Sequence, residues 1–249
     1  MLDRVQLKRE AKEIVRNARV SAYLFTFLYL AIITVLDVIN TYINGSVVTY
    51  MELNFPSVPV PEFFSRVTQL PGTLVLFVSV MVWLLMTMLN AGVALYHLGV
   101  RSGEEKGCGT LFDGFAFAGK VILLQLLVTA CVTAGMLLFV IPGLFFAYRY
   151  RFAMYNLCEN PEMGILEAFA MSRAQTHGYK MDLFVLDLTF LGWNLLGALT
   201  LGIGNIWIMP YIRQTDMGYF QQIKKMKGIG WFPPQQEDFV SQDPFDTTM

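Results

Sequence analysis

The sequence predicts an all-α protein: a polytopic membrane bundle of about six transmembrane helices, two of them short and broken at proline or glycine, with amphipathic cytoplasmic helices beside them. Hydrophobic residues make up 55% of the 249 residues and charged residues only 15%, whereas soluble domains carry roughly 25% charged residues. The mean hydropathy is +0.50. Uncharged runs of about 20 residues, the length that crosses a bilayer, recur along the chain. We therefore expect one membrane bundle and no second soluble domain.

The charge balance and the lack of familiar motifs exclude several classes of function. A formal net charge of −1 argues against a nucleic-acid partner, since such binding depends on neutralising phosphates. The chain has no HExxH, no nucleophile elbow, no P-loop and no dinucleotide fingerprint. Cys108, Cys131 and Cys158 lack the spacing of zinc ligands and are expected to be reduced. We therefore predict no catalytic residues, no cofactor and no metal, and a protein that is not an enzyme.

Residues 1–19 form the first predicted unit, a basic amphipathic helix on the cytoplasmic side. Leu7, Ala11 and Ile14 follow one another at four-residue and three-residue spacing, which places them on one helical stripe. The opposite face carries Lys8, Arg9, Lys12, Arg16 and Arg19. Such a helix can lie on a bilayer and bind anionic lipids, or it can be a solvated helix that keeps the amino terminus inside. Both alternatives place this end in the cytoplasm.

Residues 20–223 form the predicted transmembrane bundle. The first crossing is residues 20–43 and the second is residues 73–100. Residues 44–71 between them contain four prolines and a single basic residue, which predicts an external loop. The third crossing, residues 121–141, leaves the cytoplasm again.

The distribution of basic residues predicts how the chain continues after Pro142 and Gly143. If residues 144–182 stayed outside, all their arginines and lysines would be external, against the positive-inside bias. Pro142 suits the first turn of a new helix. We therefore predict a short fourth helix over residues 142–157 that returns to the cytoplasm, with Pro142 and Gly143 as its hinge. In this layout the external segments hold one of the 18 lysines and arginines.

A second break is predicted at Gly202 and Gly204, between a fifth crossing and a sixth helix over residues 205–220. Only ten residues, 203–212, separate Gly202 from Arg213, and none of them is charged. This stretch is too short to cross alone, so Arg213 and Asp216 must reach the inner interface or be sheltered by neighbouring helices. Gly202 and Gly204 would form the second hinge. Paired interrupted helices of this kind occur at the binding sites of some transporters.

The remaining segments are predicted to be cytoplasmic. Residues 160–177 form a helix capped by Asn160, with Pro161 at its first position and Gly178 as its stop signal. Residues 224–249 form a disordered tail. The predicted location is the plasma membrane, multi-pass, with both termini in the cytoplasm.

Charged residues inside the bundle are the candidate ligand-binding site: Arg149, Arg151 and Asp187. Ionisable groups at bilayer depth are costly and are usually paired. We predict that Asp187, with Asp182 as a further possibility, faces an arginine of the fourth helix. The alternative is that all of them sit in the inner leaflet, where the arginines reach the interface and the aspartate stabilises the hinge.

Several short motifs resemble a bacterial family of integral-membrane proteins known as DUF975, a domain of unknown function. The likeness covers roughly Leu7 to Phe220 and is carried by Leu7-Lys8 with Ala11-Lys12, Ile141-Pro142-Gly143, Asn160-Pro161-Glu162-Met163, Glu167-Ala168, Ser172-Arg173, Leu186-Asp187-Leu188, Gly192-Trp193, Leu201-Gly202-Ile203-Gly204 and Pro210-Tyr211. The resemblance implies a six-helix bundle in a bacterial plasma membrane, without established catalytic residues. It also implies a distant relation to the membrane domain that precedes some glycerophosphodiester phosphodiesterases.

These observations favour a protein that acts by binding. We expect a non-catalytic accessory, scaffold or envelope-maintenance component, with the lipid bilayer and possibly another membrane protein as its partners. The alternative is a transporter of small molecules or lipids that uses the intramembrane arginine and aspartate residues. An enzyme acting on lipid headgroups is a third and weaker possibility.

Overall fold

The computed structural model describes residues 4–18, 21–45, 48–49, 52–53, 70–104 and 106–230, and the regular elements within these ranges are helices. Most of the predicted external loop, and the tail from residue 231 onward, lie outside the described residues. The last helix continues to Lys227. Residues 224–227 are therefore helical, whereas a disordered tail was predicted to begin at residue 224.

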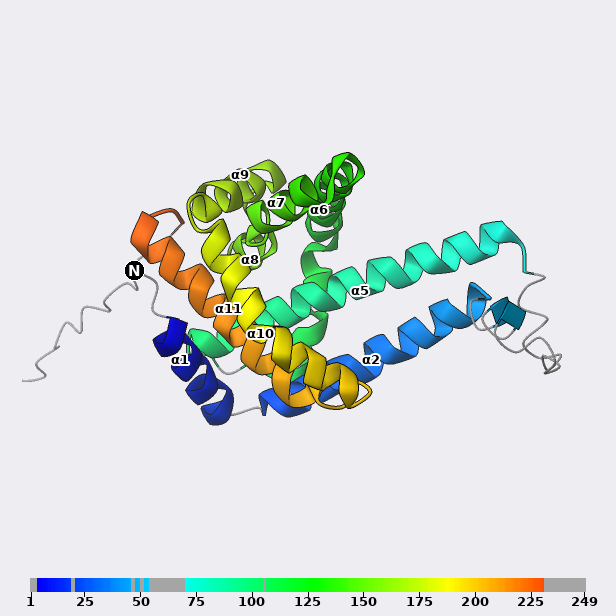
Figure 1. The fold of residues 1–249 in the computed structure, drawn as a ribbon, viewed down its shortest axis with the longest axis horizontal. Helices are drawn as coiled ribbons and strands as arrows, with labels where there is room; N and C mark the ends of the chain where they lie inside the picture. The colour runs from blue at the N-terminus through cyan, green and yellow to red at the C-terminus, as the bar shows by residue number, and fades with distance from the viewer. Residues whose placement is uncertain are drawn as a thin grey trace, which may run out of the picture.

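The first two long apolar helices, α2 (Ala22–Ile43) and α5 (Gly72–Arg101), form a long antiparallel pair. The two helices lie side by side and project away from the other helices (Figure 1). Their apolar side chains are exposed in the projecting half, where Leu76 is 66% and Phe77 62% exposed. Toward Arg101, α5 becomes buried in the protein. The exposed apolar half therefore fits the interior of a bilayer.

Four helical segments of the described residues are long and apolar enough to cross a membrane. They are α2, α5, the stretch Cys108–Leu138 formed by the 3-10 helix η2 (Cys108–Phe117) and α6 (Ala118–Leu138), and α10 (Lys180–Leu199). The predicted count of about six crossings is not confirmed. The fourth predicted helix is divided into α7 (Val140–Arg149) and α8 (Ala153–Glu159), and the ten residues of α7 span only about 15 Å.

The first hinge lies three residues before its predicted position. The chain breaks at Phe139, whose backbone is extended (φ −165°, ψ 158°), and Pro142 lies inside the first turn of α7, where its missing N–H is tolerated. A Cβ on Gly143 would lie 2.9 Å from the backbone nitrogen of Met136. Gly143 is thus required for close packing of α6 against α7 rather than for the turn.

The second hinge joins α10 to α11 (Asn205–Lys227) and lies where it was predicted. Leu201 and Gly202 have left-handed backbones, with φ of 52° and 88°, and Gly204 precedes α11, with its N–H bonded to the hydroxyl of Thr200 at 2.9 Å. A left-handed conformation suits glycine and costs other residues about 1–2 kcal/mol.

Replacing Gly202 with alanine is therefore expected to lower the free energy of unfolding by about 1–2 kcal/mol. The measurement is unfolding in detergent, monitored by circular dichroism. Gly192→Ala is a matched control because Gly192 lies within α10, has no neighbour within 4 Å of an added Cβ and does not have a positive φ. If both variants unfold at the same midpoint, the left-handed turn is not the reason for glycine at position 202.

The helix predicted over residues 160–177 begins later than expected. The helix α9 spans Ile165–Thr176 and is preceded by Gly164, so Asn160 does not cap it and Pro161 is not its first residue. Instead, the side-chain oxygen of Asn160 accepts a hydrogen bond from the N–H of Glu162 at 3.2 Å in a separate turn. The predicted stop at Gly178 is confirmed, since this residue has a φ of 86° directly after the helix.

The polar ends of the helices gather in one part of the molecule, which we call the polar head. It comprises α1 (Arg4–Asn17), α8, α9 and the final turns of α5 and α11. The apolar face of α1 packs against α11, so the buried Leu7, Ala11 and Val15 contact protein rather than lipid. Arg9, Lys12 and Arg16 remain exposed on the other face.

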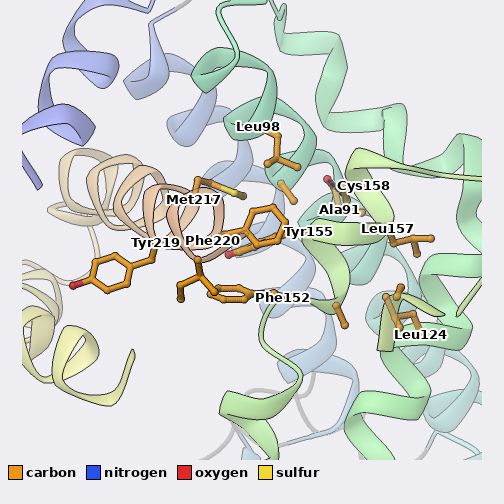
Figure 2. Close-up of a cluster of buried hydrophobic side chains, with 14 of the residues drawn as sticks. Ala91, Leu98, Leu124, Phe152, Tyr155, Leu157, Cys158, Met217, Tyr219 and Phe220 are labelled. Atoms are coloured by element: carbon orange, nitrogen blue, oxygen red, sulfur yellow. Dashed lines mark hydrogen bonds between the residues drawn. The ribbon is translucent and has the colours of Figure 1, made fainter. Parts of the chain in front are cut away.

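Aromatic side chains form the core beneath the polar head. Phe220 from α11 contacts Phe152, which directly precedes α8, and Tyr155 within α8, with ring centroids 5.2 and 5.5 Å apart. Figure 2 shows these rings together with Met217 between the two helices. All four side chains are buried. Burying a large apolar side chain stabilises a fold by about 1.5–3 kcal/mol, so this cluster fixes the position of α8 against α11.

Candidate functional site

An arginine bound by two carboxylates lies at the centre of the candidate site. Arg151, in the turn between α7 and α8, donates to Asp187 of α10 from Nη1 (2.6 Å) and from Nη2 (2.9 Å). Its Nη2 also lies 2.6 and 2.8 Å from the two carboxylate oxygens of Asp216 on α11. The hydroxyl of Tyr148 on α7 donates to Asp187 at 2.8 Å. We call these four residues the Arg151 cluster.

The cluster is well shielded from solvent on the side of α11. The side chain of Asp216 is 8% exposed and that of Arg151 is 19% exposed, whereas that of Asp187 is 37% exposed. A buried carboxylate is stable only when it is paired and hydrogen bonded. Asp216 therefore depends on Arg151 more strongly than Asp187 does.

Arg213 is a second arginine beside this cluster, with a different environment. It lies on α11 one turn before Asp216, and the hydroxyl of Tyr155 is within hydrogen-bonding reach. No carboxylate of the described residues forms an ion pair with it. Arg213 is thus a cation beside a neutral hydroxyl, with the carboxylate of Asp216 also close enough to act on it.

A cavity of about 600 Å³ opens beside Arg213, between α5, α6, α8 and α11. Its polar lining consists mainly of Thr87, Asn90, Gln125, Tyr155, Arg151, Arg213 and Asp216. Methionine, valine, alanine and tryptophan side chains line the remainder. The cavity thus has a charged end and apolar walls, which is the usual character of a small-molecule site.

The three predicted site residues have different positions. Arg151 and Asp187 are brought together, so the expected pairing of Asp187 with an arginine of this region is present. Arg149 is not part of it: its guanidinium lies over the ring of Tyr150 at 5.6 Å, and its Nε has no hydrogen-bond partner among the described residues. Asp182 pairs instead with Arg4 of α1 at 2.8 Å.

Sequence reasoning did not assign Asp216, Tyr148 or Arg213 to the site. The signal for two of them was present, because Arg213 and Asp216 interrupt an otherwise apolar helix and needed shelter. Tyr148 carried no such signal, since a tyrosine near a helix end is common in membrane proteins.

A second cavity of about 900 Å³ lies in the polar head. Four of its charged lining residues form two ion pairs: Arg101 binds Glu10 at 3.3 Å, and Lys224 binds Glu159. Burial raises the pKa of Glu159, and the contact with Lys224 opposes this shift. Arg101 also bonds the side chain of Gln221 at 2.9 Å. The lining of this cavity therefore ties α1, α5, α8 and α11 together.

Comparison with known proteins adds a family but no activity. Residues 115–227 match the family model described as Protein of unknown function (DUF975). This segment is similar to the DUF975 family. No curated protein and no solved structure matches it. The DUF975 segment contains Arg213, Tyr155 and the whole Arg151 cluster, whereas Asn90 and the other α5 residues of the cavity lie before it.

Within the described ranges, no group of three or more histidine, cysteine, aspartate or glutamate residues could hold a metal ion. The distant relation to glycerophosphodiester phosphodiesterase membrane domains stays a prediction from sequence motifs.

Proposed function

We propose that this protein is a non-catalytic component of the plasma membrane that acts by binding, as an accessory, scaffold or envelope-maintenance protein. The observation that carries the proposal is the contact of Arg151 with carboxylates from two different helices. One guanidinium bridges the two carboxylates, so it braces α10 and α11 against the turn before α8.

The proposed orientation places the polar head in the cytoplasm. Basic residues of the amino-terminal helix, of α5 and of α11 all lie in that part, and basic residues are enriched on the cytoplasmic side of membrane proteins. The exposed face of α1, with Arg9, Lys12 and Arg16, would then lie where anionic lipids are available. The exposed apolar helices would face the bilayer interior.

Transport of a small molecule or lipid is the second candidate function. The observation in its favour is the cavity beside Arg213. However, Arg149 and Asp187, which the sequence assigned to a transport site, do not line this cavity. The proposal of a binding role therefore rests on fewer assumptions.

The decisive experiment uses the full chain, purified in mild detergent and analysed by mass spectrometry for co-purifying proteins and lipids. The same preparation is reconstituted in liposomes and tested for release of entrapped anionic solutes, for lipid exchange between leaflets and for lipid hydrolysis. We expect a stoichiometric protein or lipid partner and no turnover in any of the three assays. Turnover that is lost in an Arg151→Ala variant with intact folding would overturn the proposal.

A further inference from the structure

The cavity beside Arg213 lies where α5 passes from an exposed to a buried environment. Leu85 of α5 is 40% exposed, whereas Leu89 and Val93, which follow it toward the end of the helix, are each 3% exposed. Trp83, Met86, Thr87 and Asn90 lie in this part of α5 and line the cavity. A ligand with a polar group in the cavity could therefore place apolar chains along the exposed outer half of α5.

The charges around the cavity favour an anion. Asp216 is already neutralised by Arg151, which in turn is fully engaged by two carboxylates. The amide of Asn90 is also occupied, since it donates to the backbone oxygen of Met86 at 2.9 Å and accepts from Tyr29 at 3.1 Å. Arg213 forms no ion pair among the described residues, and its electrostatic neighbours are the hydroxyls of Tyr155 and Tyr29 and the carboxylate of Asp216, which Arg151 already binds.

The chemistry of the Arg213 guanidinium narrows the class of possible ligands further. Arginine recognises carboxylates and phosphates through two parallel N–H donors. The two arginines and two aspartates of this region sum to zero formal charge, so a single negative charge is easier to accommodate than a double one. A phosphodiester carries one negative charge, and the apolar remainder of the lining includes Met86, Met154 and Met217, which adapt well to flexible chains.

We propose that this cavity binds the phosphodiester headgroup of a membrane lipid, with Arg213 as the ligand of the phosphate and Tyr155 as its positioning residue. This lipid site rests on the binding role proposed above and specifies the class of ligand that is bound. The acyl chains would lie beside α5 and α6, where Leu123 and Leu126 are 55% and 48% exposed.

The test uses Trp83, which lines the cavity, as a reporter in the full-length protein. Trp193, Trp207 and Trp231 are replaced by phenylalanine, and the protein in detergent is titrated with phosphatidylglycerol brominated on its acyl chains. We expect saturable quenching of Trp83 fluorescence. Brominated diacylglycerol, which lacks the phosphate, is expected to need at least a tenfold higher concentration for the same quenching.

Two substitutions of Arg213 test whether this residue binds the phosphate. Arg213→Gln is expected to raise the half-saturating concentration of phosphatidylglycerol at least tenfold, about 1.4 kcal/mol, and Arg213→Lys less. Arg16→Gln is the matched control, because Arg16 is exposed on α1 and remote from the cavity lining; its titration should not change. An unchanged titration in Arg213→Gln would overturn the proposal.

A second variant and a competition with inorganic phosphate complete the test. If Arg213→Gln does not fold, Tyr155→Phe is used, with an expected rise of roughly threefold, since one neutral hydrogen bond is lost; unchanged binding in that variant contradicts the proposal. Displacement of phosphatidylglycerol by inorganic phosphate at equal concentration would show a site for free phosphate and overturn the lipid assignment. Liposome turnover would reject the non-catalytic binding role but would leave a positive titration standing.

Discussion

Replacing Arg151 with alanine is expected to destabilise the protein by about 3–5 kcal/mol, the usual effect of removing one partner from a buried ion pair. The substitution leaves two carboxylates without their cation, and one of them, Asp216, has a side chain that is only 8% exposed. Their mutual repulsion adds to the cost of burial. The measurement is the free energy of unfolding in detergent, together with the yield of folded protein by size-exclusion chromatography.

The ion pair between Arg4 and Asp182 provides the control for this experiment. Both side chains are 37% exposed, and exposed pairs contribute about 0–1 kcal/mol. Arg4→Ala should therefore unfold close to the parent protein. In the same series, Asp216→Asn should be more destabilising than Asp187→Asn, because Asp187 is more exposed. Equal stability of the Arg151→Ala and Arg4→Ala variants would contradict the bracing role of the cluster.

Gly92→Ala is the second substitution with a large expected effect, a loss of about 3 kcal/mol or more, at the upper end of the range for overpacked cores. A Cβ at Gly92 on α5 would lie 2.0 Å from the backbone oxygen of Leu111 and 2.6 Å from its carbonyl carbon. Backbone atoms cannot rotate away as a side chain can, so η2 would have to move off α5. Thermal unfolding in detergent would measure the loss.

Gly119→Ala is the companion variant, because an added Cβ at Gly119 near the start of α6 meets nothing within 4 Å. Its stability is expected to stay within about 0.5 kcal/mol of the parent, as for ordinary surface substitutions. A Gly92→Ala variant that is as stable as Gly119→Ala would show that η2 does not pack on α5 as described.

The positions of the long helices could be predicted well from the sequence. Residues 20–43 and 73–100 were expected to be helical, and the helices span Ala22–Ile43 and Gly72–Arg101. These boundaries are set by the change from apolar to polar or charged residues, which is a local property. The need of a bilayer for apolar side chains makes this signal strong.

The hinge between α6 and α7 was harder to place. Pro142 suggested the break, but proline is also compatible with the first turn of a helix, and the extended residue is Phe139. Its position follows from the close approach of α7 to α6 at Gly135 and Gly143. Contacts between two helices decided this boundary, and no local pattern reports them.

The composition of the candidate site was only partly predictable. The cost of an unpaired acid in the bilayer correctly indicated an arginine partner for Asp187. The choice between Arg149 and Arg151 depends on how the chain turns between α7 and α8, and the second carboxylate comes from Asp216, 65 residues after Arg151. Such a three-way contact depends on the rotation of three helices about their axes, which hydropathy does not specify.

The contacts of Arg101 have a consequence for the biosynthesis of the protein. This residue at the end of α5 bonds Gln214 and Gln221 of the last helix, at sequence separations of 113 and 120 residues. During synthesis, the ribosome must translate η2 and the five helices α6 to α10 before α11 exists. The contacts of α1 with α11 form equally late. Folding of such non-local contacts is slow. The nascent chain is therefore expected to remain sensitive to quality-control proteases until its final segment has been inserted.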